Sequence, residues 1–398
     1  MNIKKSTLLT AAFGMALASF AAEEQAAATA TPATQAAEDA PRIAEFQKNK
    51  LPIIFVEDQA NKSAKSSYMD FEELVPIDGV VNFKLAFTDG TPGSIFVPID
   101  RKGVKFKYRV TDELKRMRKA YTGGRWEAAV EAGRHVVYPA VDIMGIPEEL
   151  TNVQENLPPF VESLAKAGRF IEAKSLMESL PLSKATPTVG VAVVRYANLA
   201  IDAGKFKDAT DILKRMNFGG ANLANAEGIM QIAHKLRKLG RTSDAVELYT
   251  RLQATPQNPL ANESKMWMAY CDVLKNNDIS ARLFVDELKS LPKTEGAFSL
   301  RCLVNGMLFE KQKKFDDALD SYAEGIVYGD LSSEWMPNML FNIAKLYKAN
   351  KDFVASNEIF EQITLLYPAS EYSKPSQGEI VEIKEEKSED EEGEEEEE

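Results

Sequence analysis

Residues 226–256 read AEGIMQIAHKLRKLGRTSDAVELYTRLQATP. Apolar residues recur at the three- and four-residue spacing of an amphipathic helix on both sides of the turn Gly240-Arg241-Thr242. One small residue, Ala233 or Ala245, stands in each half, and a small residue on each of two helices lets their backbones approach closely. The segment therefore predicts a hairpin of two packed helices.

The same arrangement recurs along the chain. The equivalent turns are Gly124-Arg125-Trp126, Gly168-Arg169-Phe170, Gly204-Lys205-Phe206, Lys313-Lys314-Phe315 and Lys351-Asp352-Phe353. Small residues after the turns form one series: Ala129, Ala173, Ala209, Ala245, Ala281, Ala318 and Ser356. A second series runs twelve positions upstream: Ala197, Ala233, Ala269, Gly306 and Ala344. Two phased series predict an α-solenoid of about seven helical hairpins over residues 111–370.

This pattern resembles the tetratricopeptide repeat (TPR), which has a small residue within its first helix, an alanine early in its second, a following aromatic and an exit proline. The last repeat carries Ala344, Tyr347, Phe353, Phe360 and Pro368. The fourth carries Ala233, Ala245, Tyr249 and Pro256, and the sixth Gly306, Phe309, Ala318 and Tyr322. The repeat period is nearer 36 than 34 residues, and the first two repeats are 44 residues apart. The resemblance implies a right-handed superhelix that binds protein or peptide partners on its concave face.

The family's groove positions, carried onto this sequence, mix basic groups with aromatic and apolar ones. They are Asn198, Asp202, His234, Arg237, Lys238, Tyr270, Met307, Glu310, Lys311, Asn338, Phe341, Lys345 and Lys348. Such a surface suits a partner that has apolar anchors and some acidic groups. Ordinary solvated helix positions are the alternative for each residue taken singly.

The residues before the repeats change character twice. Residues 1–21 have the basic start, apolar stretch and small-residue cleavage site of a secretory signal peptide, which predicts export to the periplasm or cell envelope, or secretion. Residues 22–42 have the composition of a disordered linker. Residues 43–110 predict a small β-rich unit, with strands at 51–56, 80–87, 94–99 and 104–110, that caps the open end of the helical array.

The net charge of −12 is concentrated at one end of the chain. Residues 379–398 hold thirteen carboxylates and two lysines, so the remainder is nearly neutral. Residues 371–398 are therefore predicted to be a disordered acidic tail, either a solubilising appendage, a tether for a cationic partner, or a segment that folds back on the basic groove. No basic face is available for nucleic acid, and no segment after the predicted signal is long and apolar enough to be an integral membrane helix.

Chemistry-bearing residues are sparse. The two histidines, His135 and His234, lie in no paired motif, and no cofactor loop or metal-ligand spacing is present, so the chain is predicted not to be an enzyme and to need no cofactor. Export would allow a disulfide, but Cys271 and Cys302 fall at different heights on neighbouring predicted helices and are expected to be buried or half-buried free thiols.

Together these features predict a non-enzymatic scaffold or adaptor of the cell envelope. The alternative is a structural subunit of a homo-oligomeric or multi-protein envelope assembly. The shape of the predicted fold, rather than any catalytic motif, carries both hypotheses.

Overall fold

The computed structural model describes residues 43–47, 53–56, 67–68, 71–77, 80–86, 91–98, 105–108 and 110–382. The chain divides into two units, Met1–Arg42 and Ile43–Glu398, and every described residue belongs to the second. The predicted signal segment, the predicted linker and the acidic residues after 382 lie outside the described residues.

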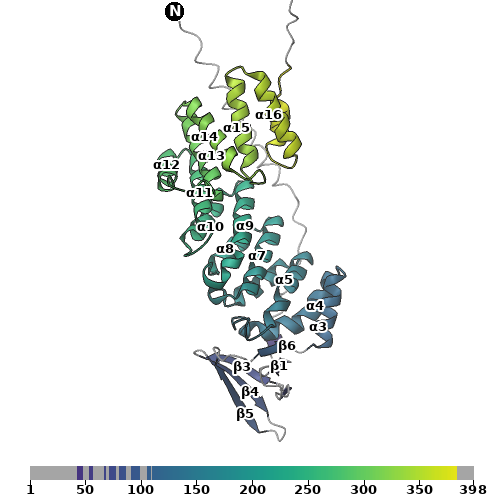
Figure 1. Cartoon of the computed structure of the whole chain (residues 1–398). Helices are drawn as coiled ribbons and strands as arrows, with labels where there is room; N and C mark the ends of the chain where they lie inside the picture. Colours follow the sequence, from purple (N-terminus) through teal and green to yellow (C-terminus); the bar gives the residue numbers. More distant parts are fainter. Residues whose placement is uncertain are drawn as a thin grey trace, which may run out of the picture. The chain divides into compact units, whose positions relative to one another are not determined.

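Helices pair into hairpins throughout the described residues that follow Val110, and successive hairpins pack on one another in chain order (Figure 1). The seven pairs are α3 (Asp112–Thr122) with α4 (Trp126–Val137), α5 (Leu157–Lys166) with α6 (Phe170–Ser179), α7 (Pro187–Asp202) with α8 (Phe206–Arg215), α9 (Ala226–Lys238) with α10 (Thr242–Ala254), α11 (Ala261–Leu274) with α12 (Asp278–Glu287), α13 (Gly296–Lys311) with α14 (Phe315–Tyr328), and α15 (Met336–Ala349) with α16 (Phe353–Leu366). The predicted seven-hairpin array is confirmed, and the fold is TPR-like. The right-handed superhelical sense stays a prediction.

The long first interval in the repeat has a structural cause. The 3₁₀ helices η2 (Tyr138–Ile143) and η3 (Val153–Asn156) lie between α4 and α5. Short 3₁₀ helices also precede α7 and α9, namely η4 (Leu182–Lys184) and η5 (Gly220–Asn225). The short helix α2 (Ile43–Gln47) packs on η2, where the Phe46 and Tyr138 ring centroids are 5.4 Å apart.

Strands precede the helical array. They are β1 (Ile53–Val56), β2 (Ser67–Tyr68), β3 (Phe71–Ile77), β4 (Val80–Ala86), β5 (Pro92–Pro98) and β6 (Lys105–Tyr108). They pair antiparallel in the orders β2-β1-β6 and β3-β4-β5. Four overlap the ranges expected from the sequence, whereas β2, β3 and the helix α2 were not expected. A separately packed β-rich unit over 43–110 stays a prediction, because the strand side chains lie outside the described residues.

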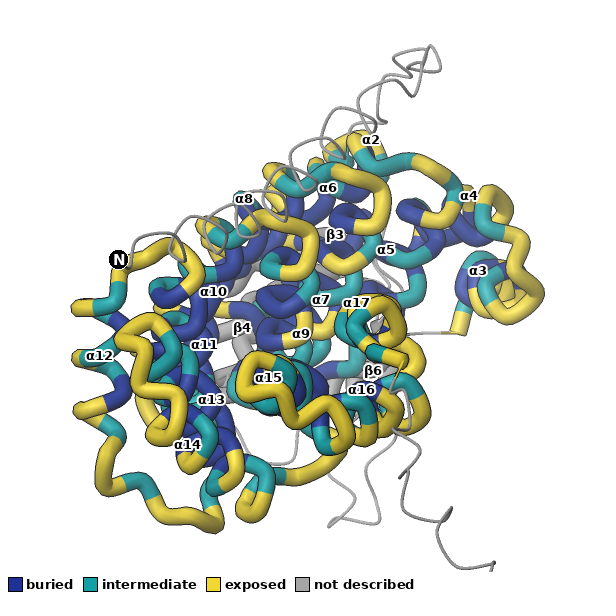
Figure 2. The backbone as a smooth tube through the Cα atoms, turned by 90° about the horizontal axis from the view of Figure 1, so that it is seen from above, coloured by how far each residue is buried: buried dark blue, intermediate teal, exposed yellow. Residues whose placement is uncertain are grey.

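The two small-residue series lie in the buried contacts between helices. All members of both series are buried, and Figure 2 shows the buried positions along the facing sides of neighbouring helices. The limiting case is Gly306, where an added Cβ atom would lie 2.2 Å from Cε1 of Tyr322. At Gly306 the Tyr322 ring therefore leaves no room for a larger residue.

Each hairpin turn uses one residue in the left-handed backbone region. Glycine occupies it at 124, 168, 204 and 240, whereas Asn276, Lys313 and Lys351 adopt it with φ of 60°, 61° and 66°. The turn bonds are of helix-ending type: Arg241 N–H donates to the Leu236 carbonyl at 2.9 Å, and Lys314 N–H to that of Phe309 at 3.0 Å. The repeat turn thus fixes a backbone conformation first and a residue type second.

The tail boundary predicted at residue 371 does not hold. Helix α17 (Ser373–Glu379) packs on α16, and both Ser373 and Ser376 are buried. Ser376 Oγ donates to the Tyr372 carbonyl at 2.7 Å. The high acidity begins only at Glu379. Because the residues just before it are also polar, the prediction assigned to the tail a short helix that packs on the end of the array.

Replacing Gly306 with alanine is expected to destabilise the protein by about 1–3 kcal/mol, because the added methyl group overpacks the contact with Tyr322. Gly296, at the start of the same helix, has no atom within 4 Å of an added Cβ atom and serves as the matched control. Urea unfolding followed by circular dichroism measures both variants. Equal midpoints for Gly306→Ala and Gly296→Ala would contradict the packing constraint.

Replacing Lys313 with glycine is expected to raise stability by up to about 1 kcal/mol, because it relieves a left-handed conformation that costs a non-glycine residue about 1–2 kcal/mol. The neighbouring Gln312 has φ of −82°, so Gln312→Gly should lower stability. Thermal unfolding of the two variants tests the pair. A lower melting temperature for Lys313→Gly would show that its backbone is not strained.

Candidate functional site

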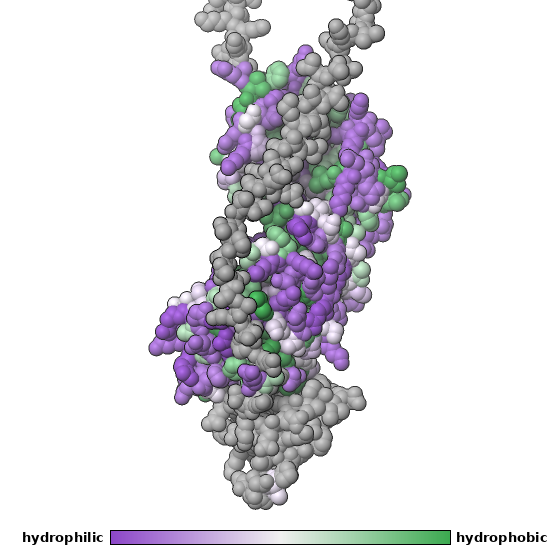
Figure 3. All heavy atoms as spheres, turned by 180° about the vertical axis from the view of Figure 1, so that it is seen from behind, coloured by the Kyte–Doolittle hydropathy of each residue, from purple (hydrophilic) through white to green (hydrophobic). Residues whose placement is uncertain are grey.

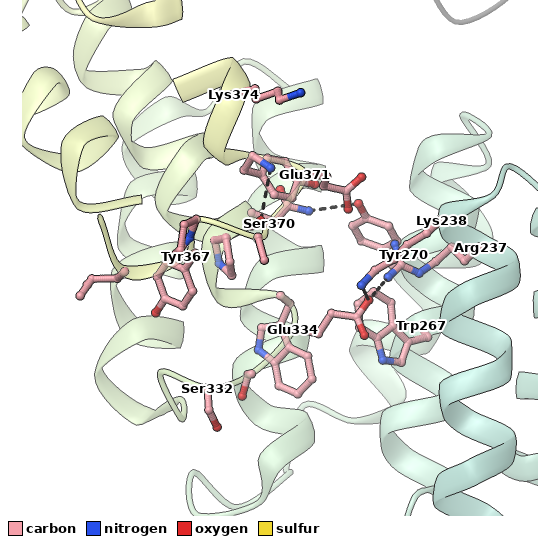
Figure 4. Close-up of a pocket in the computed structure, with 18 residues that line it drawn as sticks. Arg237, Lys238, Trp267, Tyr270, Ser332, Glu334, Tyr367, Ser370, Glu371 and Lys374 are labelled. Carbon is pink, nitrogen blue, oxygen red and sulfur yellow. Dashed lines mark hydrogen bonds and ion pairs between the residues drawn. The ribbon is translucent and has the colours of Figure 1, made fainter. Parts of the chain in front are cut away.

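Segments from three hairpins and from the start of α17 enclose a pocket of about 750 Å³ (Figure 4). One side is formed by α9 and α11, the first helices of the fourth and fifth hairpins. The other side is formed by residues 332–338, which lead into α15, and by residues 366–374, which connect α16 to α17. Residues more than 90 positions apart in the sequence thus line one cavity.

The floor of this pocket is an arginine on an aromatic platform. The guanidinium carbon of Arg237 lies 4.3 Å from the Trp267 ring centroid and 5.4 Å from that of Tyr270. Only 8% of the Arg237 side chain is exposed. The stacking holds the guanidinium in a fixed plane, which preserves its hydrogen-bonding direction.

Glu334 points across the pocket to this cation (Figure 4). Its Oε1 accepts a hydrogen bond from Nη2 of Arg237 and pairs with Nζ of Lys238 at 3.2 Å. Its Oε2 lies 3.7 Å from Nε2 of His234. A single carboxylate from the loop before α15 therefore faces three basic side chains of α9.

His234 is buried below this ion pair. Its Nδ1 is hydrogen-bonded with the Tyr249 hydroxyl at 2.8 Å, and its ring centroid is 4.9 Å from that of Trp267. Burial lowers the pKa of His234 to about 4, so the imidazole is neutral near pH 7. Burial also raises the pKa of the nearby Glu263 carboxyl, which accepts from Trp267 Nε1 at 3.2 Å.

The far wall is held by hydrogen bonds between hairpins. Asn338 Nδ2 donates to the Tyr270 hydroxyl at 3.0 Å, and Trp335 Nε1 donates to Ser299 Oγ at 3.0 Å. The Tyr372 ring lies 5.4 Å from that of Phe341. These contacts join the fifth, sixth and seventh hairpins around the aromatic side of the pocket.

The end of α17 and the residues after it are held by polar contacts to α15 and α16. Lys348 Nζ contacts the Glu379 carbonyl and Oε2, each at 2.7 Å. Asn357 donates to the Val381 carbonyl at 2.7 Å and accepts from Val381 N–H at 3.0 Å. We call residues 373–382 the C-terminal strap. It contacts Lys348, which the sequence placed in the groove.

A second pocket of about 620 Å³ lies between the third and fourth hairpins. Asn198, Asp202, His234 and Lys238 are among its lining residues. Lys235, also in the lining, pairs with Asp202 at 2.6 Å and donates to Asn198 Oδ1 at 2.8 Å. These mutual contacts leave this pocket without the convergence of charge seen at Arg237.

The structure divides the thirteen predicted groove residues. Four line the larger pocket: Arg237, Lys238, Tyr270 and Asn338. His234 lies beneath it and lines the smaller pocket, where Tyr249 and Trp267 enclose the ring and leave 4% of the residue exposed. A role for His234 in partner binding stays a prediction.

The predicted residues of the sixth and seventh hairpins have mainly structural contacts. Glu310 accepts from the Tyr322 hydroxyl, and Lys311 binds the Val273 carbonyl at 2.6 Å and Asp278 at 2.8 Å. Met307 packs against the core. Phe341 packs between the rings of Phe360 and Tyr372, and Lys345 lies over Phe341 at 5.8 Å.

Four important pocket or neighbouring residues were missed: Trp267, Glu334, Trp335 and Tyr372. Trp267 stands one helical turn before the predicted Tyr270 on α11, and this spacing could have indicated it. Glu334 and Trp335 lie in a loop, and Tyr372 lies in the segment expected to be a tail. No repeat position predicts their side of the pocket.

Within the described ranges, no group of three or more histidine, cysteine or acidic side chains is placed to hold a metal ion. None of the helices in those ranges combines the length and apolar character needed to cross a bilayer. Cys271 and Cys302 are free and buried, as predicted, and burial raises their thiol pKa values to about 11 and about 12.

The fold and pocket define a TPR-like helical-hairpin protein, and solved structures that resemble it include proteins of this kind. The type IV pilus biogenesis factor PilW shares 15% identity over 57% of this chain and 99% of its own, with a TM-score of 0.35. The C-terminal part of a TPR repeat-containing protein from Cytophaga hutchinsonii shares 12% over 66% and 98%, with a TM-score of 0.37. A tetratricopeptide repeat protein from Parabacteroides merdae shares 16% over 57% and 85%, also with a TM-score of 0.37.

These likenesses do not extend to activity or partners at such identities and TM-scores. No family model matches the chain, and no curated protein matches it. The candidate site is therefore defined by its own residues and contacts.

Acidification from pH 7 to pH 5 is expected to lower the free energy of unfolding by about 2 kcal/mol through His234. The reason is that this imidazole binds a proton with a pKa of 6.5 in the unfolded chain but only with a pKa of about 4 in the folded protein. Stability from this group is complete above pH 6.5 and falls through that window. Urea unfolding at both pH values, compared between the native chain and His234→Asn, isolates the contribution.

The charged groups that face His234 are Glu263, Glu334, Arg237 and Lys238, and all remain in the variant. Protonation of Glu263, whose pKa is raised, acts in the opposite direction and cancels in the comparison. Parallel pH dependences for the two proteins would show that His234 is not the responsible group.

Proposed function

We propose that this chain is a non-enzymatic scaffold or adaptor of the cell envelope that binds a protein or peptide partner in the pocket between α9, α11, α15 and α17. The observation that carries the proposal is the buried Arg237 on its Trp267 and Tyr270 platform, facing a cavity of about 750 Å³. Arginine, tryptophan and tyrosine in desolvated pockets dominate the binding energy of protein interfaces.

The chemistry of the pocket favours binding over catalysis. Its only histidine neighbour, His234, is enclosed and hydrogen-bonded to Tyr249. The lining instead combines aromatic walls with three basic groups and two carboxylates, Glu334 and Glu371. Such a surface orients a partly acidic, partly apolar partner.

Localisation and the remaining segments complete the proposal. The signal-like residues 1–21 support export. The strands of residues 43–110 would form the β-rich unit that caps the first hairpin, since an end repeat must cover its apolar face. The acidic residues after 382 would keep the protein soluble.

The alternative, a subunit of a homo-oligomeric or multi-protein assembly, is favoured by one observation. Helix α12 exposes Ile279 and Leu283, at 81% and 67%, one helical turn apart. Elsewhere the surface is more polar: on the face drawn in Figure 3, polar side chains predominate among the coloured residues and the apolar areas are small. Light scattering after size exclusion separates the two functions, because a monomer that Ile279→Lys leaves unchanged excludes self-assembly through α12.

The scaffold function is tested by crosslinking and affinity capture from the native envelope with the chain lacking residues 1–21. The double variant Arg237→Gln with Lys238→Glu should reduce recovery of the specific partner at least tenfold compared with the native chain, because each substitution removes a basic group from the pocket. Lys289→Glu, at an exposed position outside the pocket, is the matched control and should leave recovery unchanged. Equal recovery by all three proteins, each folded by circular dichroism, would rule out this pocket as the binding site.

A further inference from the structure

We infer that the site formed by Arg237 and Lys238 receives a carboxylate of the partner and that Glu334 occupies this place in the unbound protein. This inference rests on the proposed function and adds two things to it. It gives the ligand a chemical class, and it makes one loop residue an internal competitor for the site.

The first argument is the convergence of charge on Glu334. Both Arg237 and Lys238 pair with its Oε1, and Nε2 of His234 lies 3.7 Å from its Oε2. The partners come from α9 and the carboxylate from residue 334, so no helical spacing requires them to meet. The α9 groups thus form a receptor for a carboxylate that comes from another part of the chain.

The second argument is that the contact is incomplete. Glu334 engages Arg237 through Nη2 alone, and the buried Nε has no hydrogen-bond partner among the described residues. A guanidinium binds a carboxylate most strongly when two parallel N–H groups donate to its two oxygens. Arg237 Nε is buried while Glu334 is in place, so a carboxylate that replaces Glu334 would gain the second bond by reaching this atom.

The third argument concerns how Glu334 is held. It lies between α14 and α15, in a loop fixed on either side by other residues: Asp330 Oδ1 accepts from Ser332 N–H at 2.8 Å, and Trp335 donates to Ser299. The Glu334 side chain is 22% exposed. It can therefore rotate away from Arg237 while its loop and both helices stay in place.

The pocket beside this place is aromatic. Trp267, Tyr270, Trp335, Tyr367 and Tyr372 belong to its lining (Figure 4). The place that receives the carboxylate adjoins this aromatic wall. The ligand that fits is therefore an acidic peptide with a large aromatic or apolar side chain next to its carboxylate. When Glu334 withdraws, Glu371 is the one carboxylate left in the lining against Arg237, Lys238 and Lys374.

The test compares peptide affinity for the native chain and for Glu334→Gln, which keeps the shape of the side chain and removes its charge. The probe is an N-acetylated pentapeptide that ends in tryptophan and glutamate with a free C-terminal carboxylate, and titration calorimetry measures its binding. Removal of the competitor should tighten binding about 5- to 150-fold, the fold-change that corresponds to an interaction of about 1–3 kcal/mol. Glu358→Gln, which neutralises an exposed carboxylate of α16 outside the pocket, should change it less than twofold.

Three further measurements make the result specific. The same peptide with glutamine and a C-terminal amide should bind at least tenfold more weakly, and Arg237→Gln should abolish the gain from Glu334→Gln. Inorganic phosphate should not compete with the acidic peptide at equal ionic strength. Unchanged affinity in Glu334→Gln, equal binding of acid and amide peptides, competition by phosphate, or no binding at millimolar peptide would each overturn the inference.

These outcomes are separate from those of the capture experiment. If capture depends on Arg237 and Lys238 while Glu334→Gln leaves peptide binding unchanged, the proposed function stands and the carboxylate inference falls. If capture is independent of both residues, the proposed function falls whatever the peptide does.

Discussion

Close contact between the two helices of each hairpin is the constraint on which the structure depends. Alanine, glycine or serine stands at both contact positions from the third hairpin to the seventh, and each is buried. Where Gly306 meets Tyr322, even a methyl group has no space. Since these five hairpins are closed in the same way, their first helices follow one another at similar intervals, and side chains from α9 and α11 can line a common pocket.

The pocket is formed by residues on the regularly packed helices together with residues in loops and beyond the last hairpin. Arg237, Trp267 and Tyr270 lie on helices whose positions the contacts set. Glu334 and Trp335 lie in a loop, and Tyr372 lies beyond the last hairpin. The ion pair of Arg237 with Glu334 and the hydrogen bond of Asn338 with Tyr270 join these two groups. Regular packing thus provides the basic wall, and irregular segments provide the Glu334 carboxylate and the opposite wall.

This division explains how much could be predicted from the sequence. The hairpins, their turns and the basic side of the pocket follow a repeat. The position of a residue such as Ala233 within that repeat therefore predicts that it is buried at a helix contact. The insertion over residues 138–156 has no counterpart in other repeats. Glu334 meets Arg237 across 97 positions, and Asn357 binds the backbone of Val381, whose side-chain type carries no trace of that contact. Pairings of this kind have no periodicity to reveal them.

The contact between Arg237 and Glu334 also affects how the array unfolds. An array in which each repeat touches only its neighbours can lose its terminal repeats one at a time. Here the fourth hairpin is tied to the loop that begins the seventh, and the fifth to the seventh through Tyr270 and Asn338. Loss of the last hairpin would expose Trp267 and leave Arg237 without its carboxylate. The C-terminal half therefore forms one cooperative block, in which events at the chain's end reach α9 directly.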